Sequence, residues 1–230
     1  MTQSETRRDR YLTDVALENY LKGIYQLGAR DGCRVKTKAL AEHLEVSLPS
    51  GTGMLRSRAD EERVDYRPYQ GVDLTEHGRS VALRIIRNHR LIETFLVTAL
   101  GFRWDEVHDE AEVLEHAISP KLAAAIEHYL GFPKYDPHGD PIPSAEGEVE
   151  PRRSVDLSKA ALGSSAVVTR IRDQSPDFLR YLEELGLVPG AQLDVIEIVP
   201  FDGPIRVRCG GRETSLSRSQ LDRIEVAPAG

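Results

Sequence analysis

The chain has 230 residues, of which 40% are hydrophobic and 29% are charged, as in ordinary soluble globular proteins with one large or several small domains. No apolar run approaches the roughly 18 residues that cross a bilayer. The first ten residues are polar and lack the apolar core of a secretory signal. Two cysteines, Cys33 and Cys209, are too few for a disulfide framework. We therefore expect a cytoplasmic protein.

The net charge of −7 comes from the middle of the chain. Within residues 76–150 acidic residues are twice as numerous as basic ones, whereas residues 1–75 and 151–230 are each balanced. A nucleic-acid-binding protein usually carries a basic surplus, and none is present here. The acidic middle favours a positively charged ligand such as a divalent cation, although on composition alone a solvated acidic face is the simpler interpretation.

The N-terminal third has the element order of a winged helix-turn-helix. Helical spacing of apolar residues predicts a helix of about 15 residues over 12–27. Thr37 can cap a second helix over 38–44. A third helix over 49–61 begins with a proline, which suits the first helical turn, and two short strands around a turn follow within 64–74.

In a winged helix-turn-helix the second helix of the pair presents its N-terminal residues to the major groove, and the wing lies on the DNA backbone. A generic three-helix core is the alternative, but the hairpin that follows favours DNA binding. Gly51 and Gly53 argue the other way, because each weakens the third helix by roughly 1 kcal/mol relative to alanine. The candidate DNA-contacting residues are Lys36, Thr37, Lys38, Ser47, Pro49, Ser50, Thr52, Arg56, Arg58, Arg67 and Tyr69.

The middle of the chain is predicted to be helical. Thr75 can cap a long helix that ends near Leu100, and further helices are expected over 105–117 and 120–130. Residues 131–151 are rich in proline, glycine and acidic residues, a composition typical of a linker.

Beyond residue 155 short β-like runs alternate with turns, which predicts a small barrel. One helix, over 176–185, interrupts them, and Gly186 is expected to end it. The expected strands lie within 166–171, 193–199, 205–209 and 223–226.

The most specific pattern for chemistry is a set of imidazoles and carboxylates in the acidic middle. On one helix, His108, Glu112, Glu115 and His116 would share a face, since they stand at i, i+4, i+7 and i+8. His89 and Glu93 form an i, i+4 pair on the preceding helix. Such a set can coordinate a divalent transition metal. The alternative is a solvated helix face, because Glu and His are common on surfaces.

The donors in this set are nitrogen and oxygen, with no thiolate nearby. Such ligands suit Mn²⁺ or Fe²⁺ better than Cu⁺ or a structural Zn²⁺. The margin is small, because the general affinity order for divalent metals places Zn²⁺ and Cu²⁺ above Mn²⁺.

Over nearly its whole length the chain resembles the diphtheria toxin repressor / manganese transport regulator family of metal-dependent regulators. The C-terminal part resembles that family's SH3-like domain, which is also found in a ferrous transport accessory protein. The motifs that carry the resemblance are Glu18-Asn19-Tyr20-Leu21, Leu40-Ala41-Glu42, Gly71-Val72, Asn88-His89-Arg90-Leu91-Ile92-Glu93, Val107-His108-Asp109-Glu110-Ala111, Leu114-Glu115-His116, Asp140-Pro141-Ile142-Pro143 and Leu182-Glu183-Glu184-Leu185-Gly186-Leu187-Val188-Pro189-Gly190.

The resemblance implies a mainly α-helical fold with a small β part. Residues 1–75 would form a winged helix-turn-helix domain, 76–143 a helical dimerisation and metal-binding domain, 144–154 a linker, and 155–230 an SH3-like small barrel. It also implies a homodimer that binds a palindromic operator in double-stranded DNA and represses metal-uptake genes.

The resemblance also implies a wider ligand set. Glu112, Glu115 and His116 match family metal ligands, and His89, Glu93 and His108 fall on positions used in one or the other of two family sites. The remaining implied ligands are Asp136 and His138 in an Asp-Pro-His turn, Asp177 and less directly Gln174 in the third domain, and Asn19 on the first helix.

Four positions depart from the family patterns. Asn19 stands where iron sensors have Met and manganese sensors have Asp, and Lys22 stands where some manganese sensors have Glu. Glu112 stands where iron sensors have Cys, and Asp136 replaces a Cys in the turn. The last two changes favour a harder cation, so Mn²⁺ is expected ahead of Fe²⁺ as the cofactor.

Two other functions fit parts of the pattern. A metalloenzyme could use the same carboxylates and imidazoles, but the sequence has no His-Glu-x-x-His, phosphate loop or nucleophile elbow, and catalysis leaves the winged-helix segment unexplained. A DNA-binding protein that works without metal is the third interpretation. Operator affinity measured with and without Mn²⁺ separates it from a metal-dependent regulator.

Overall fold

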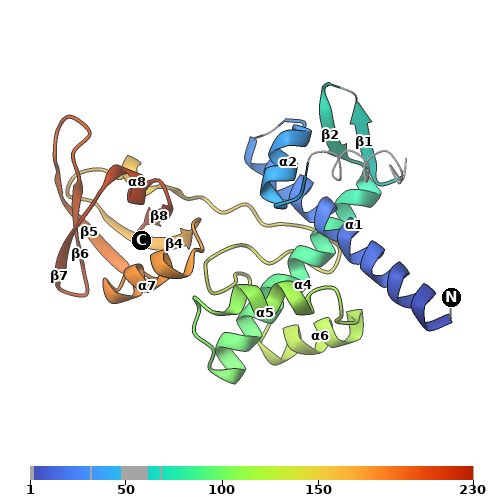
Figure 1. Ribbon diagram of the computed structural model, residues 1–230. Helices are drawn as coiled ribbons and strands as arrows, with labels where there is room; N and C mark the ends of the chain where they lie inside the picture. Colours follow the sequence, from blue (N-terminus) through green and yellow to red (C-terminus); the bar gives the residue numbers. More distant parts are fainter. Residues whose placement is uncertain (1–2, 32, 48–61, 68, 230) are drawn as a thin grey trace. The chain divides into compact units, whose positions relative to one another are not determined.

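The computed structural model forms two compact units, each described here by itself (Figure 1). In the described part of the chain, no helix has both the length and the apolar character needed to cross a membrane. The structure describes residues 3–31, 33–47, 62–67 and 69–229. The first unit consists of residues 1–89, 115–118 and 143–148, and the second of 90–114, 119–142 and 149–230.

The first unit begins with two helices, α1 (Gln3–Asp31) and α2 (Thr37–His43), that pack on each other. The helix α1 begins nine residues before the predicted start at residue 12, because residues 3–10 contain no apolar side chain whose spacing could predict a helix. Lys36 rather than Thr37 occupies the N-cap position of α2, and its side chain makes no capping hydrogen bond. The predicted third helix, over residues 49–61, lies outside the described residues.

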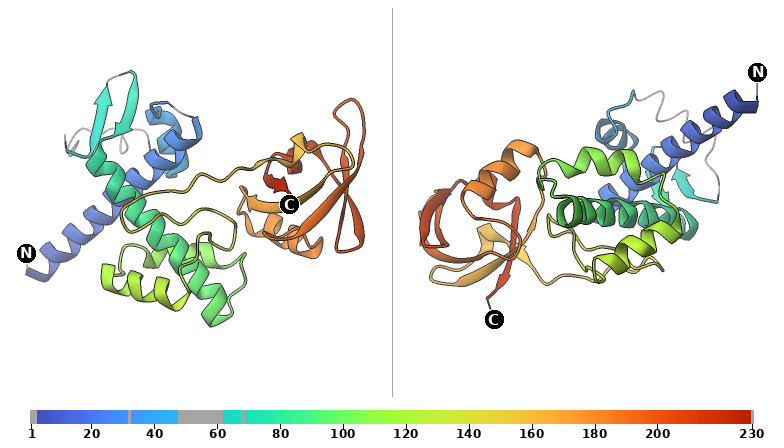
Figure 2. Two further views of the ribbon diagram at one scale, coloured as in Figure 1. Left: turned by 180° about the vertical axis from the view of Figure 1, so that it is seen from behind. Right: turned by 90° about the horizontal axis from the view of Figure 1, so that it is seen from below.

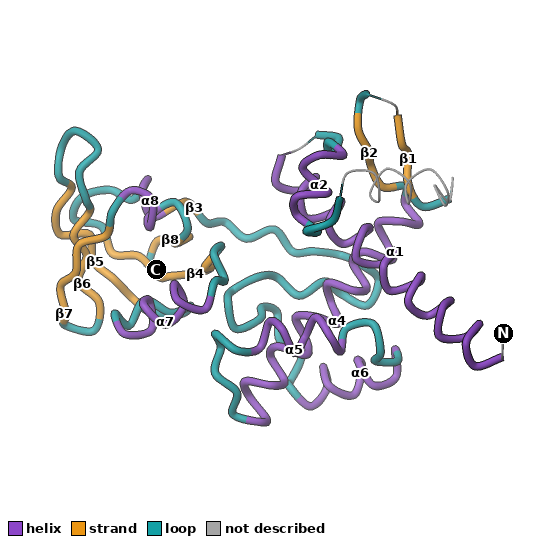
Figure 3. The backbone as a smooth tube through the Cα atoms, viewed as in Figure 1, coloured by secondary structure: helices purple, strands orange, loops and turns teal. Residues whose placement is uncertain are grey.

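The predicted wing is present as the antiparallel strands β1 (Val64–Arg67) and β2 (Gly71–Leu74) (Figures 1 and 3). Val35 pairs with Val72 as a further bridge, so the hairpin is held to the chain before α2. Gly71 has φ +112°, and a Cβ there would lie 2.5 Å from the Val35 carbonyl oxygen, so only glycine fits. The core shared by these elements consists of Tyr20, Leu21, Ile24, Leu27, Val35, Leu40, Val64, Val72 and Ala82.

The long helix α4 (Glu76–Leu100) begins directly after the wing. Thr75 caps it as predicted, since its Oγ1 accepts a hydrogen bond from the Gly78 amide at 3.2 Å. The helix ends at the predicted residue, and Gly101 follows it with φ +73°.

The next two helices, α5 (Val107–Leu114) and α6 (Pro120–Tyr129), are shorter than predicted. The helix α5 ends at Leu114 rather than Ala117, so Glu115 and His116 lie in a turn beyond the helix. Pro120 begins α6, and the residue before a proline is pushed into an extended conformation. Ser119 is extended and accepts a bond from the Leu122 amide, which requires the chain to leave helix α5 first.

Residues 131–142 are an ordered turn rather than the linker that their composition suggests, even though they form no helix (Figure 3). The Asp136 carboxylate accepts hydrogen bonds from the His138 and Asp140 amides, each at 2.9 Å. Gly139 has φ +90°, and a Cβ there would lie 2.0 Å from the Thr169 carbonyl oxygen. The second unit therefore holds this turn tightly.

The C-terminal part is a small, curved antiparallel sheet, seen from further directions in Figure 2. Its strand order is β3-β8-β4-β5-β6-β7. The helix α7 (Pro176–Glu184) adds Leu179 and Leu182 to the core of the sheet. As predicted, Gly186 follows the end of this helix, with φ +73°. The strands are β3 (Val155–Asp156), β4 (Ser165–Ile171), β5 (Gln192–Ile198), β6 (Ile205–Cys209), β7 (Arg212–Leu216) and β8 (Ile224–Pro228).

The sequence patterns did not predict the short elements of this C-terminal part. The strand β7 is an edge strand that pairs only with β6. Only Leu216 of its five residues is buried, so the strand lacks the apolar content of a recognisable β run. The 3₁₀ turn η1 (Leu157–Lys159) and the helix α8 (Arg218–Leu221) are each about one turn long, too short to show a periodicity.

Candidate metal centre

Three buried side chains of the second unit come together as a candidate metal site, which we call the Asp136 group: Glu93, Asp136 and His138. Each offers one ligand atom, and these atoms all lie within 4.8 Å of one another. Glu93 projects from α4, while Asp136 and His138 come from the ordered turn. Their exposed fractions are 1%, 6% and 0%. Buried charges of one sign require a compensating partner.

His138 is oriented as a metal ligand. Its Nε2 donates to the Trp104 carbonyl oxygen at 2.8 Å, because a carbonyl can only accept. In the neutral ring, Nδ1 then carries the lone pair. This atom is buried, lies 3.7 Å from Glu93 Oε2, and has no hydrogen-bond partner among the described residues. A ligating histidine typically bonds a carbonyl through its other nitrogen, so the donor set fits a metal ion.

The electrostatics of the Asp136 group also favour a cation. Burial first, and then the neighbouring Asp140 and Glu93 carboxylates, raise the pKa of Asp136 to about 7. Burial alone would lower the pKa of His138, but the Glu93 and Asp136 carboxylates and the Trp104 carbonyl together outweigh burial and raise it. Arg90 lies beside Asp136, with Nε 3.7 Å from Oδ2, and also bonds Asp140 at 3.2 Å. The arginine is therefore shared between two carboxylates.

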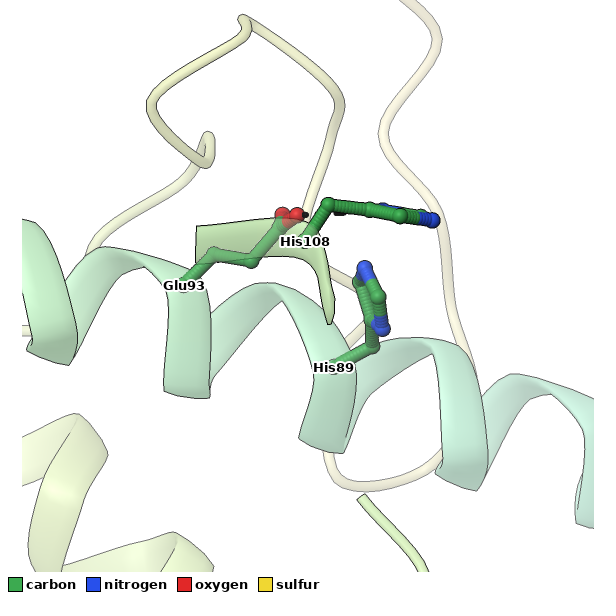
Figure 4. Close-up of side chains that lie close together, drawn as sticks. All are labelled: His89, Glu93 and His108. Atoms are coloured by element: carbon green, nitrogen blue, oxygen red, sulfur yellow. Dashed lines mark ion pairs between the residues drawn. The ribbon is translucent and has the colours of Figure 1, made fainter. Parts of the chain in front are cut away.

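His108 lies beside Glu93 of this group (Figure 4). Its Nδ1 lies 3.6 Å from Glu93 Oε1 and its Nε2 lies 3.7 Å from Glu112 Oε1. The His108 side chain is 47% exposed, so its ion pairs are weakly held. Figure 4 also draws His89, which stands one turn before Glu93 on α4.

In the first unit a second set surrounds Glu115, and we call His89, Glu115 and His116 the Glu115 group. Glu115 is fully buried, and both of its carboxylate oxygens accept hydrogen bonds from Lys22 Nζ, at 2.9 and 2.8 Å. The Nδ1 atom of His89 lies 2.6 Å from Glu115 Oε2. The Glu115 carbonyl accepts a bond from the Asn88 side-chain amide at 2.9 Å, which replaces a helical bond.

His116 connects this group to α1. Its Nδ1 lies 2.6 Å from Glu18 Oε2, and its Nε2 lies 2.7 Å from Asn19 Oδ1. Burial opposes ionisation of Glu18, but bonds from His116 and Arg84 outweigh it and lower its pKa. Through this contact Asn19 lies beside His116, a predicted metal ligand. The roles of Glu18 and Lys22 were missed, although their i, i+4 spacing on α1 indicates a shared face.

The third-domain candidates are placed differently from each other. The Asp177 side chain is 96% exposed and pairs with Arg180, one turn later on α7. The structure does not bring it to the Asp136 group. Gln174 is closer, since its Nε2 donates to Asp140 Oδ2 at 3.0 Å, next to the ordered turn.

The candidate DNA-contacting residues divide into described and undescribed sets. Lys36, Lys38, Ser47, Arg67 and Tyr69 are exposed, and Thr37 is partly buried. Tyr69 is fully exposed at the hairpin turn with φ +63°, and Lys36 Nζ donates to the Gln70 carbonyl at 3.3 Å. Pro49, Ser50, Thr52, Arg56 and Arg58 lie outside the described residues.

Comparison with known families accounts for most of the chain. Residues 12–72 match the N-terminal DNA-binding domain of iron dependent repressors. Residues 75–144 match the metal binding and dimerisation domain of the same repressors. Residues 155–228 match the FeoA domain.

Individual proteins are similar over nearly full length. The iron-dependent repressor IdeR of Mycobacterium tuberculosis H37Rv is 30% identical, over 91% of this chain and 95% of that protein. A solved manganese-dependent transcriptional repressor in complex with manganese is 42% identical with a TM-score of 0.84, over 92% of this chain and 99% of that one. The manganese regulator SloR is 31% identical with a TM-score of 0.73, over 93% and 98%. The chain belongs to the diphtheria toxin repressor / manganese transport regulator family of metal-dependent transcriptional repressors.

Proposed function

We propose that this repressor senses Mn²⁺, with Fe²⁺ as the second choice, and that the Asp136 group is its principal metal site. The observation that carries the proposal is the buried Nδ1 atom of His138, which faces two buried carboxylates and has no hydrogen-bond partner among the described residues. The role is that of a cytoplasmic regulator rather than an enzyme.

The donor chemistry supports manganese. The Asp136 group offers two carboxylates and one imidazole. Hard oxygen donors suit Mn²⁺ better than they suit softer metals. Neither thiol is part of the group, since Cys33 is exposed and Cys209 Sγ bonds the Gly186 carbonyl within the C-terminal sheet. The relatives divide between the two metals, because one solved relative is named for manganese and IdeR is named for iron.

When bound, a divalent ion would add positive charge beside the two buried carboxylates, in addition to that of Arg90 next to Asp136. Glu93 holds its place on α4, while the Trp104 carbonyl orients the His138 ring. The ordered turn is anchored from the other side, since the Ile171 amide donates to the His138 carbonyl at 2.9 Å. Loading the group therefore joins α4 to the turn, and α4 is the helix that begins at the DNA-binding wing.

We further propose that the chain works as a homodimer on a palindromic operator that controls metal-uptake genes. A two-fold symmetric dimer reads two half-sites only when its recognition elements have the correct separation. Residues 100–132 supply exposed apolar side chains that a dimer could bury: Leu100, Phe102, Val113, Leu114, Leu122, Tyr129 and Phe132.

The remaining sequence-based assignments stay as proposals. Residues 1–75, 76–143 and 155–230 act as DNA-binding, dimerisation and SH3-like domains, with 144–154 as the linker. His89, His108, Glu112, Glu115, His116 and Asn19 form the second predicted set of metal ligands, and Asp177 is the weakest candidate because its side chain is almost fully exposed.

Calorimetric titration of the metal-free protein with Mn²⁺, Fe²⁺ and Zn²⁺, combined with operator binding, tests the proposal. We expect His138→Ala to weaken the tightest Mn²⁺ binding by about 100-fold or more, since even residues behind the ligands contribute 10–100-fold. The control is His128→Ala, which removes an exposed histidine of α6. The proposal is contradicted if His138→Ala and His128→Ala bind Mn²⁺ with equal affinity, or if operator binding does not depend on Mn²⁺.

A further inference from the structure

Lys22 is a buried lysine whose ammonium group pairs with the Glu115 carboxylate. Only 6% of the residue is exposed, and Glu115 is not exposed at all. The ammonium group bonds both Glu115 oxygens, at 2.9 and 2.8 Å. Lysine is almost never this buried unless it is paired, so the Lys22–Glu115 pair is a built feature of the first unit.

The ammonium occupies the position that a metal ion would need. Lys22 Nζ lies 3.4 Å from His89 Nδ1, and His89 Nδ1 in turn lies 2.6 Å from Glu115 Oε2. On the other side of the same carboxylate, His116 Nε2 lies 3.3 Å from Glu115 Oε1. Lys22 therefore stands among the nitrogen and oxygen atoms of the Glu115 group. An ammonium carries only donors, so it uses the lone pairs that a metal would share.

The same helix face holds α1 to this group without an ion. Lys22 stands four residues after Glu18 and three after Asn19, and both of these bond His116. The first helix thus contacts both Glu115 and His116 through side chains of its own. Neutralisation and attachment, the two effects that a metal would have here, are already supplied by the chain.

We propose that Lys22 is an internal cation that competes with divalent metal at the Glu115 group and weakens metal binding there. This inference rests on the proposed metal-sensing function, and it makes Lys22 the residue that sets the order of filling. The Asp136 group fills first, and the Glu115 group fills only at higher metal concentration. A divalent ion at Glu115 has to displace the ammonium or bind against its repulsion.

The test measures Mn²⁺ binding to the full chain, with free Mn²⁺ followed by electron paramagnetic resonance. In a His138→Ala background, which removes a ligand of the Asp136 group, we expect Lys22→Met to tighten the remaining Mn²⁺ binding by about tenfold or more. Lys22→Arg keeps the charge and is expected to leave that affinity within about twofold. Lys121→Met, at an exposed lysine of α6, is the matched control and is expected to change nothing.

Thermal unfolding gives a second readout. Without metal, Lys22→Met removes the ammonium from the buried Glu115 carboxylate and leaves only the His89 and His116 rings beside it, so the melting temperature of the variant falls below that of the wild type. We expect Mn²⁺ to raise the melting temperature of this variant more than that of the wild type. Lys22→Gln, which can still donate a hydrogen bond to Glu115, provides a folded neutral variant if Lys22→Met does not fold, and the same tightening is expected.

The outcomes separate this inference from the proposed function. If wild-type protein binds Mn²⁺ but neither neutral variant binds it more tightly at the remaining site, Lys22 is only a structural ion pair and the inference is wrong. If the wild type binds no Mn²⁺ while the neutral variants do, the inference holds and the Asp136 group is not the principal site. If no variant binds Mn²⁺, both fail.

Discussion

The Nε2 atom of His138 donates to the backbone carbonyl of Trp104 at 2.8 Å, and this one bond determines which ring nitrogen faces the carboxylates. The two rings also stack, with centroids 5.8 Å apart and an interplanar angle of 23°. Because a backbone carbonyl cannot change its role from acceptor to donor, the orientation is independent of neighbouring side-chain protonation. The Nδ1 atom is thereby directed toward the Asp136 group.

We therefore expect His138 to be in the Nε2–H form in metal-free protein whenever its ring is neutral. Nitrogen-15 NMR distinguishes a protonated from a bare ring nitrogen. Addition of diamagnetic Zn²⁺ is expected to shift the His138 Nδ1 resonance and to leave the exposed His128 unchanged. A bare Nε2 in the metal-free protein contradicts the assignment.

The raised pKa of Asp136 predicts how stability depends on pH. Its pKa is about 7 in the folded protein and about 3.9 in an unfolded chain. Between these values the folded state binds more protons, so metal-free protein loses stability as pH rises from about 4 to about 7. Asp136→Asn removes this contribution, so its melting temperature, relative to the wild type, is expected to increase with pH over this range.

The same linkage applies to metal binding. A carboxylate must lose its proton to bind a metal, so Mn²⁺ affinity is expected to rise with pH until Asp136 is ionised, at about pH 7. Calorimetry in buffers of different ionisation enthalpy measures the protons released. Affinity that is flat between pH 5 and 7 is incompatible with Asp136 as a ligand.

Gly139 is expected to be irreplaceable in the ordered turn. A Cβ at this position would lie 2.0 Å from the Thr169 carbonyl oxygen, in addition to the strain of φ +90°. Gly163→Ala is the matched control, because Gly163 has φ +76° but nothing within 4 Å of its Cβ position. We expect Gly163→Ala to cost about 1 kcal/mol of unfolding free energy and Gly139→Ala clearly more.

Gly139→Ala is also expected to weaken Mn²⁺ binding, since any shift of the turn moves Asp136 and His138. Chemical denaturation measures the first effect and calorimetric titration the second. Equal costs for the two glycine variants would show that the close approach at Gly139 is relaxed without penalty.

The exposed apolar side chains within residues 100–132 predict a variant that separates the subunits. Val113 on α5 is 73% exposed, so Val113→Glu leaves the folded subunit nearly unchanged while placing a charge in the proposed interface. We expect the dimer dissociation constant to rise by at least about tenfold in sedimentation equilibrium. Val155→Glu, at a 48% exposed valine of β3, is expected to leave it unchanged.

Local sequence was sufficient for most elements of the fold. Apolar spacing and caps predicted α4 from Thr75 to Leu100, the two wing strands and the helix α7 with Gly186 after it. These features depend on interactions between residues a few positions apart, which a sequence records directly. The resemblance to the repressor family added the domain order and the residues of the ordered turn.

Tertiary structure decided what those residues do. The Lys22–Glu115 pair joins residues 93 positions apart, and the Glu93–His138 approach joins α4 to a segment whose composition resembles a linker. The end of α5 at Leu114 placed Glu115 in a turn, where a helix as far as residue 117 was predicted. Burial and charge pairing depend on the whole fold, because they are set by which distant segments exclude water from a side chain. The sequence therefore determined which donors the protein has, and the fold determined which of them face each other and which one faces a lysine.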